Sequence, residues 1–321
     1  MAQLIKLYDY VSRYELDVYR YPSQFIRLKK QQWDKVSLAW ENNSFHSVMK
    51  VSQASDFKVE DGNEKRSFLT RFKTKRLKVA EETSDQNPLV YEAAIEDKEL
   101  QFPFTTIPKT IDDLKHLFLD YIFRFQIRWA SSTLREKSSV DPSVFRDRLL
   151  RYFVQRLPDH YLLLYRPVFK LKNAPVELDI ILIGTTEVYC MTFIEELDET
   201  VFTGSKEKFW VARRGDHEKK LLNPVLSLNR TGTVVQKLIS AGQMEIPVRK
   251  FIISRNGYID YPFAPYDITI LDKRTFDDWF QRLRNASAPL KHIQLKAAQV
   301  LLSHGLTTSY YRSEWNEESN E

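Results

Sequence analysis

The sequence predicts an α/β protein in which a mixed β-sheet is flanked by helices, with an additional, mainly helical domain at its N-terminus. Two observations predict the sheet: short β-branched, apolar runs recur between residues 161 and 194, and further runs of this kind alternate with helical patterns after residue 223. A third observation predicts the N-terminal domain, because helical periodicity dominates its clearest segments.

The N-terminal domain is expected to span residues 1–138. Apolar residues such as Leu4, Leu7 and Val11 recur at helical spacing over residues 3–22, and Pro22 is expected to end that helix. A second helix is expected over residues 110–137. The stretch 24–100 is mixed and gives no clear assignment.

The second domain is expected to span residues 139–288. Asp141-Pro142 predicts a helix start that leads to a stop at Leu157-Pro158. A C-terminal helix is expected in residues 289–311, followed by an acidic tail at 312–321. The elements expected inside the second domain are the strands 161–165, 176–183, 188–194, 250–254 and 267–271 and the helices 141–156, 223–240 and 275–284.

Composition and cysteine usage narrow the class of protein. Hydrophobic residues make up 43% of the 321 residues, which is enough for a sizeable core. No apolar run approaches the length of a membrane span, and Cys190 is the single cysteine, which suits a reducing compartment. We therefore expect a cytoplasmic protein without a membrane partner. The net charge of +5 is a weak indication of a polyanionic partner.

Several classes of enzyme are disfavoured by what the sequence lacks. It contains no glycine-rich phosphate loop and no Gly-x-Ser-x-Gly elbow. Its six histidines are scattered, so that none pairs with another at metal-ligand spacing. Nucleotide hydrolysis by a phosphate loop, serine-elbow catalysis and a zinc site are therefore not expected.

The acidic pair Glu177 and Asp179 is the clearest candidate for chemistry. Because side chains alternate along a strand, both acids share a face with Ile181 and Ile183. An acid facing the core of a sheet is costly unless it is paired or binds a cation. The alternative is that both acids lie at the solvated end of the strand, paired with a lysine or an arginine.

An ordered series of features resembles the nuclease-related domain, a branch of the PD-(D/E)XK, or restriction-endonuclease-like, superfamily. It comprises the Leu157-Pro158 stop, the Glu-x-Asp strand, the turn at Gly184 into Val188-Tyr189, then Gly204, Trp210, Gly215, Asn223-Pro224 and Ile246-Pro247-Val248. The resemblance covers a little under half of the chain. It implies a restriction-endonuclease-like fold over residues 139–288 and a bacterial source.

In that family, carboxylates hold Mg²⁺ and a lysine activates water. Aligned without gaps, the resemblance places the upstream acid near Asp147 and the metal-binding Asp on Asp179. It places the Glu on Thr192 and the Lys on Ile194, so the catalytic motif is degenerate. The hairpin geometry puts Asp179 opposite Thr192. We therefore expect a non-catalytic protein, without a cofactor, that binds nucleic acid or a protein partner.

Two alternatives stay open at this point. The first is an active Mg²⁺-dependent nuclease that combines Asp147 and Asp179 with a displaced Glu196 or Glu187 and with Lys206. The second is an interaction protein without a nucleic-acid role, whose N-terminal helices contact a partner protein.

A basic segment supplies a candidate contact with DNA or RNA. It holds seven basic residues in fourteen with no acid among them, and such a face suits phosphate contacts. The alternative is a solvated face balanced by acids at 81–99. The residues are Lys65, Arg66, Arg71, Lys73, Lys75, Arg76 and Lys78.

Overall fold

The computed structural model describes residues 1–42, 108–171 and 174–311. These residues divide into two compact units. One unit joins Met1–Gln31 to the described residues from Ile122 onward, and the other consists of the described residues between Gln32 and Tyr121. The basic segment 65–78 and the acidic tail 312–321, for which we made predictions above, lie outside the described residues.

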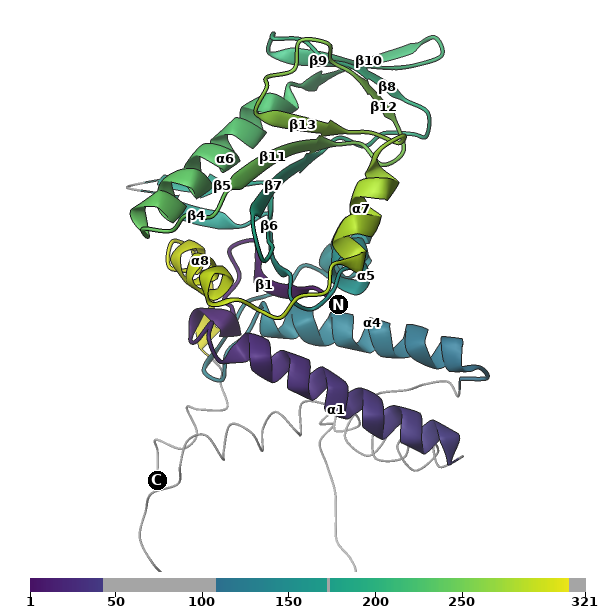
Figure 1. Cartoon of the computed structure of the whole chain (residues 1–321), viewed down its shortest axis with the longest axis vertical. Helices are drawn as coiled ribbons and strands as arrows, with labels where there is room; N and C mark the ends of the chain where they lie inside the picture. Colours follow the sequence, from purple (N-terminus) through teal and green to yellow (C-terminus); the bar gives the residue numbers. More distant parts are fainter. Residues whose placement is uncertain (43–107, 172–173, 312–321) are drawn as a thin grey trace, which may run out of the picture. The chain divides into compact units, whose positions relative to one another are not determined.

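The first unit is built on a six-stranded sheet in the order β1-β3-β6-β7-β11-β13 (Figure 1). Strand β6 runs antiparallel to β3 and β7, whereas the pairs β1–β3, β7–β11 and β11–β13 are parallel. The expected mixed sheet is therefore confirmed. Its strands are β1 Gln3–Leu7, β3 Leu162–Tyr165, β6 Ile180–Ile183, β7 Val188–Phe193, β11 Val248–Ile253 and β13 Ile268–Leu271.

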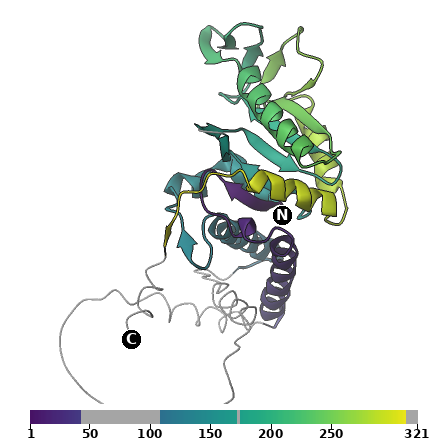
Figure 2. The same cartoon turned by 90° about the vertical axis from the view of Figure 1, so that its left-hand side faces the viewer.

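Helices cover both faces of this sheet, as expected of an α/β protein. On one face, α6 (Pro224–Ala241) packs against β7 and β11, and α8 (His292–Leu302) packs against α6 and β6 (Figure 2). On the other face, α5 (Arg148–Arg156) and α7 (Phe276–Asn285) contribute Phe153 and Trp279 to a core with Tyr189 and Phe251. Burial of these large side chains stabilises the sheet.

The helix expected over residues 3–22 was wrong. Gln3–Leu7 forms β1, every residue of which is buried, and pairs in parallel with β3. Pro22 lies in the first turn of α1 (Tyr21–Glu41), where proline is favoured, and so begins a helix instead of ending one. Because β1 belongs to the central sheet, the expected separate helical domain ending at residue 138 is not confirmed.

The helix expected at 110–137 is found as α4 (Ile111–Trp129), which ends earlier than expected. In the first unit, the end of α4 packs Phe125 and Trp129 on Phe25 of α1. In the second unit, Trp33 contacts Phe118 edge to face at 5.1 Å. Across the described residues, we find no helix whose length and apolar character would let it cross a lipid bilayer.

Two expected elements are each divided in the structure. The strand 176–183 is interrupted at Leu178 and Asp179 into β5 (Ala174–Glu177) and β6. The helix 141–156 consists of a 3-10 turn η2 (Pro142–Arg146) capped by Asp141, followed by α5, which is capped by Asp147. The remaining short elements of this unit are η1 Arg13–Glu15, β2 Glu136–Lys137, β4 Val168–Leu171 and β14 Tyr310–Tyr311.

A second sheet of four strands, in the order β10-β9-β8-β12, was not predicted (Figure 1). Its β9–β10 hairpin turns at Gly215, whose φ of 57° is the left-handed conformation that tight hairpin turns require. The strands are β8 Val201–Thr203, β9 Phe209–Arg214, β10 His217–Leu222 and β12 Tyr258–Asp260.

Candidate active site at Asp179

Asp179 lies immediately before β6, at the edge where β7 ends. The β6–β7 pairing joins Ile183 to Val188 and Ile180 to Met191, so the next pair along is Asp179 with Thr192. The Thr192 hydroxyl donates a hydrogen bond of 2.6 Å to Asp179 Oδ2. The predicted register is therefore confirmed.

Thr231 of α6 fixes the same carboxylate from the other side. Its side chain is fully buried, and its hydroxyl oxygen accepts a 2.9 Å hydrogen bond from the Asp179 backbone N–H. The Thr231 hydroxyl also lies 3.5 Å from Asp179 Oδ2. Asn223 caps α6 and Pro224 opens it, which sets the position of this helix on the sheet.

These contacts engage one oxygen of the Asp179 carboxylate. Within the described residues, the hydrogen bonds to the carboxylate fall on Oδ2, and Oδ1 accepts none. The side chain is only partly buried, so water reaches it. A carboxylate that is oriented by two hydroxyl groups and open on one oxygen can accept a proton.

A cavity of about 240 Å³ opens in front of Asp179. It carries both signs of charge, because Glu177 and Asp179 share it with Arg166 and Arg230. Neither arginine has an ion-pair partner within the described ranges, so both guanidinium groups can meet an anion. The lining residues of this cavity, the Asp179 pocket, are Arg166, Glu177, Leu178, Asp179, Ile180, Met191, Thr192, Phe193 and Arg230.

Backbone strain marks the strand ends beside this pocket. Arg166 follows β3 with a φ of 47°, and Tyr8 follows the neighbouring strand β1 with a φ of 48°. The Tyr8 N–H donates to Tyr165 O at 3.1 Å, which ties the two strand ends together. Left-handed conformations cost on the order of 1 kcal/mol or more in residues with a Cβ, and such strain clusters at functional sites. Burial raises the pKa of Tyr8.

Asp147, the expected upstream acid, has a different role in the structure. Its Oδ1 accepts hydrogen bonds from the backbone N–H groups of Leu149 and Leu150, at 2.9 and 3.0 Å, and so caps α5. Its Oδ2 accepts a 2.7 Å hydrogen bond from the Tyr165 hydroxyl, whose pKa is raised by burial and by Asp147 itself. Both oxygens are therefore engaged in holding the fold.

The other candidate acids also have partners away from Asp179. Glu196 accepts a 2.5 Å hydrogen bond from Lys219, and Glu187 pairs with Arg249 at 3.4 Å. The neighbouring acid Glu195 pairs with Arg255 through a 2.7 Å hydrogen bond. The structure does not bring any of these acids together with Asp179.

The lysine and metal positions of the nuclease-related pattern are likewise not rebuilt. Lys206 is exposed before β9, and Ile194 is buried beyond the end of β7. Within the described residues, no group of three or more His, Cys, Asp or Glu side chains could hold a metal ion. Among the described residues, the acids and the lysine that the resemblance assigns to a Mg²⁺ site therefore do not come together.

Three residues at the Asp179 pocket were missed from the sequence. Arg166 directly follows the predicted strand 161–165, so its place at a strand end was a usable signal. Arg230 and Thr231 lie inside the predicted helix 223–240. Ser227, one turn into that helix, bonds to Pro224 O at 3.1 Å, and Thr231, one turn further along, contacts Asp179.

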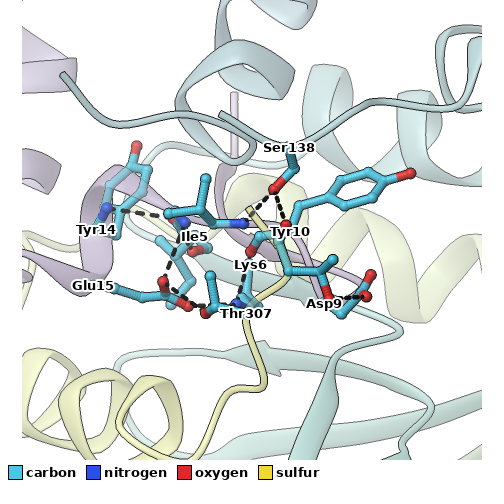
Figure 3. Close-up of polar contacts among 11 residues, drawn as sticks. Ile5, Lys6, Asp9, Tyr10, Tyr14, Glu15, Ser138 and Thr307 are labelled. Carbon is cyan, nitrogen blue, oxygen red and sulfur yellow. Dashed lines mark hydrogen bonds and ion pairs between the residues drawn. The ribbon is translucent and has the colours of Figure 1, made fainter. Parts of the chain in front are cut away.

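A second, larger cavity of about 560 Å³ lies beside a buried ion pair. Figure 3 shows the polar contacts around that ion pair. Lys6 has a fully buried side chain and pairs with Glu15, which lines the cavity. The Lys6 ammonium also donates to Tyr10 O at 2.7 Å and contacts the Thr307 hydroxyl at 3.4 Å. We call Lys6, Tyr10, Glu15 and Thr307 the Lys6 network.

The Lys6 network joins segments that are far apart in the chain. It links β1 and η1 to the C-terminal segment, and Ser138 extends it by donating to Thr308 O at 2.6 Å. Burial lowers the pKa of Lys6, while Glu15 opposes that shift. All three donors of the ammonium meet protein oxygens, so the network has a structural role.

The chain is similar to a known protein over part of its length. It is 31% identical over 128 residues to an RNA 2′,3′-cyclic phosphodiesterase of Geobacillus stearothermophilus. The match covers 39% of this chain and 36% of the relative, so it spans well under half of either protein. No model of a protein family matches the chain. No solved structure matches it either.

This similarity corrects the functional expectation drawn from the sequence. The relative is named for hydrolysis of a phosphodiester, which contradicts the interpretation of the chain as a degenerate, non-catalytic nuclease relative that binds nucleic acid or a partner. The expectation relied on Thr192 and Ile194, two positions at the end of one strand, whereas the charged residues of the Asp179 pocket come from other elements. The resemblance to the nuclease-related domain itself stays a prediction.

Proposed function

We propose that this chain hydrolyses the 2′,3′-cyclic phosphate at the end of an RNA, in the Asp179 pocket. One observation carries the proposal: an oriented carboxylate shares a small cavity with two arginines that have no ion-pair partner in the described part of the chain. The relative, an RNA 2′,3′-cyclic phosphodiesterase, supports the choice of substrate by its name.

The two arginines bind the phosphate. Arg166 comes from the end of β3 and Arg230 from α6, so they reach the pocket from different elements. A guanidinium group stays charged at every physiological pH and offers several donors to phosphate oxygens. Negative charge on those oxygens grows as the phosphorus becomes five-coordinate, and the arginines stabilise that state most.

Asp179 acts as the general base. Its Oδ1 removes a proton from a water molecule while the water oxygen forms a bond to phosphorus. The bond from phosphorus to one ribose oxygen breaks, and that oxygen takes a proton from solvent water, which the open pocket admits. Asp179 then returns its proton to the hydroxide left in the solvent, so the carboxylate is regenerated. One water molecule is consumed, and the product is a phosphomonoester with a free ribose hydroxyl.

Thr192 and Thr231 are positioning residues in this scheme. Both act through Asp179, because their hydroxyl groups contact Oδ2 and thereby turn Oδ1 toward the pocket. No step requires a metal ion, so we expect hydrolysis to persist in EDTA. Activity that disappears in EDTA and returns with Mg²⁺ would contradict this part of the scheme.

The direct test is hydrolysis of 2′,3′-cyclic AMP by the full chain and by Asp179→Asn. The asparagine oxygen can still accept the Thr192 hydrogen bond, so the variant is expected to fold. We expect it to lower kcat/KM by a factor of about 10² to 10⁴, the usual cost of losing a general base. Asp278→Asn, on the exposed face of α7, is the matched control and should keep full activity. A wild-type chain without activity, or an Asp179→Asn variant as active as wild type, would overturn the proposal.

A further inference from the structure

The four-stranded sheet carries an exposed apolar face. Along β9, Trp210 and Ala212 are buried while Phe209 is 47% exposed. The pairing places Leu222 of β10 opposite Phe209, and Leu222 is 55% exposed. Because side chains alternate along strands, Phe209 and Leu222 lie on the face opposite Trp210.

The same face continues onto β8. Val211 of β9 pairs with Thr203, and Val201, two residues before it, is 37% exposed. We call Val201, Thr203, Phe209, Val211, Lys220 and Leu222 the outer sheet face. Its neighbour on the buried side, Phe202, is 1% exposed, so the sheet has one packed face and one open face among the described residues.

Lysines border the β9–β10 side of this open face, whereas Asp260 of β12 lies opposite Thr203 at its other side. The Lys208 ammonium lies 5.6 Å from the centre of the Phe209 ring, and Lys220 lies opposite Val211 on the face itself. Neither these two lysines nor Lys206 has an ion-pair partner in the part of the chain that the structure describes. By contrast, Arg213 is neutralised by Glu218.

We infer that the outer sheet face binds single-stranded RNA. An exposed aromatic ring on an open sheet offers a stacking surface for an unpaired base, and lysines beside it suit the phosphates that follow. A duplex keeps its bases stacked inside, so Phe209 selects a single strand. The lysines favour a polyanion over an apolar protein surface, which would leave their charges without partners.

This inference rests on the proposed function for the identity of the nucleic acid, and it would make a polynucleotide the preferred substrate. The strand β7, which carries Thr192 of the Asp179 pocket, leads through residues 194–200 directly into β8. The outer sheet face would therefore hold the body of the RNA while the Asp179 pocket receives its end.

The test is binding of fluorescein-labelled decauridine that already ends in a 3′-phosphate, measured by anisotropy with the full chain. We expect Phe209→Ala to weaken binding about tenfold, as for loss of one stacked base, and Phe209→Trp to retain it. Tyr266→Ala removes an even more exposed ring before β13 and should leave the Kd unchanged. Lys208→Gln and Lys220→Gln should each reduce the slope of log Kd against log salt by about 0.7, whereas Lys237→Gln on α6 should not.

Three outcomes would overturn the inference: no RNA binding by the wild-type chain, equal losses in Phe209→Ala and Tyr266→Ala, or a dimer in sedimentation that Phe209→Ala dissolves. The two proposals fail separately. Hydrolysis of 2′,3′-cyclic AMP should be unaffected by Phe209→Ala, and RNA binding should be unaffected by Asp179→Asn. If hydrolysis failed while RNA binding persisted, the proposed function would be wrong, and the inference that the outer sheet face binds RNA would still hold.

Discussion

The Asp179 pocket and the Lys6 network both hold charged groups beside a cavity. They differ in whether those groups have hydrogen-bond and ion-pair partners within the protein. In the Lys6 network, the buried ammonium contacts Glu15, Tyr10 O and the Thr307 hydroxyl, so protein oxygens accept all three of its hydrogen bonds. In the Asp179 pocket, Arg166 and Arg230 have no carboxylate partner among the described residues, and Asp179 Oδ1 accepts no hydrogen bond from them.

This difference is the reason for assigning the Lys6 network a structural role and for proposing the Asp179 pocket as the functional site. Removing one partner of a buried ion pair destabilises the fold, because the other charge is then buried without a partner. A charged group without a protein partner costs less free energy in an open cavity, because water solvates it there. Such a group can exchange that water for a ligand. Cavity volume alone would favour the other site, since the cavity beside Lys6 is the larger of the two.

Replacing both arginines of the Asp179 pocket should strongly lower kcat/KM for 2′,3′-cyclic AMP. In Arg166→Gln/Arg230→Gln, two charged hydrogen bonds to the phosphate disappear, each worth about 2 kcal/mol, so kcat/KM for 2′,3′-cyclic AMP should fall about a thousandfold. The measurement is steady-state hydrolysis with thermal unfolding as a check on folding. Arg282→Gln on the exposed side of α7 is the control. Unchanged kcat/KM in the double variant would place the phosphate elsewhere.

Breaking the Lys6 network should affect stability and leave catalysis intact. Lys6→Met leaves Glu15 without its cation in a largely buried position, which should lower the free energy of unfolding by about 3 kcal/mol. Chemical denaturation measures this, with Lys30→Met on the exposed side of α1 as control. A variant of normal stability that has lost hydrolysis would instead make the Lys6 cavity the active site.

Replacing Asp147 should also lower stability and leave catalysis unchanged, with a smaller loss of stability. Asp147→Ala removes the cap of α5 and the acceptor of the Tyr165 hydroxyl, so we expect a loss of about 2 kcal/mol in unfolding free energy. Because both carboxylate oxygens serve the fold, kcat/KM should stay near that of the wild type. If hydrolysis were abolished while stability remained normal, Asp147 would regain the catalytic role first predicted for it.

The smallest effect concerns pH. Burial raises the pKa of Tyr165 in the folded chain, so above the ordinary value of about 10 the unfolded chain gives up a proton that the folded chain keeps. Folded Tyr165 therefore contributes stability that is complete below pH 10 and is lost as the pH rises, by up to about 1.4 kcal/mol per pH unit. Denaturation curves of Tyr165→Phe should show a shallower decline than wild type over this range. Parallel declines would contradict a raised pKa at this position.

The sequence predicted the centre of the fold better than its margins. The strand register at Asp179 followed from hairpin geometry alone, because a short turn between Ile183 and Val188 determines every pair that follows. The N-terminal strand was missed because a short, wholly buried run fits a strand as well as a helix. The β9–β10 hairpin was missed because β10 is largely charged and shows no regular alternation.

The candidate site was only half predictable, for a physical reason. Asp179 and Thr192 are neighbours through a hairpin, so local geometry connects them. Arg166, Arg230 and Thr231 reach the pocket only when β3 and α6 pack on the sheet, and that packing depends on tertiary contacts that no local pattern encodes. A protein partner for the N-terminal helices and a cytoplasmic location also stay predictions.

The most direct test of the central claim is a crystal structure of Asp179→Asn soaked with 2′,3′-cyclic AMP. The variant should bind the substrate without consuming it, because the general base is absent and the arginines remain. We predict that the cyclic phosphate lies between the guanidinium groups of Arg166 and Arg230, with the substituted asparagine side chain still held by Thr192. A phosphate bound at any other place, such as the cavity beside the Lys6 network, would contradict the assignment of the Asp179 pocket as the active site.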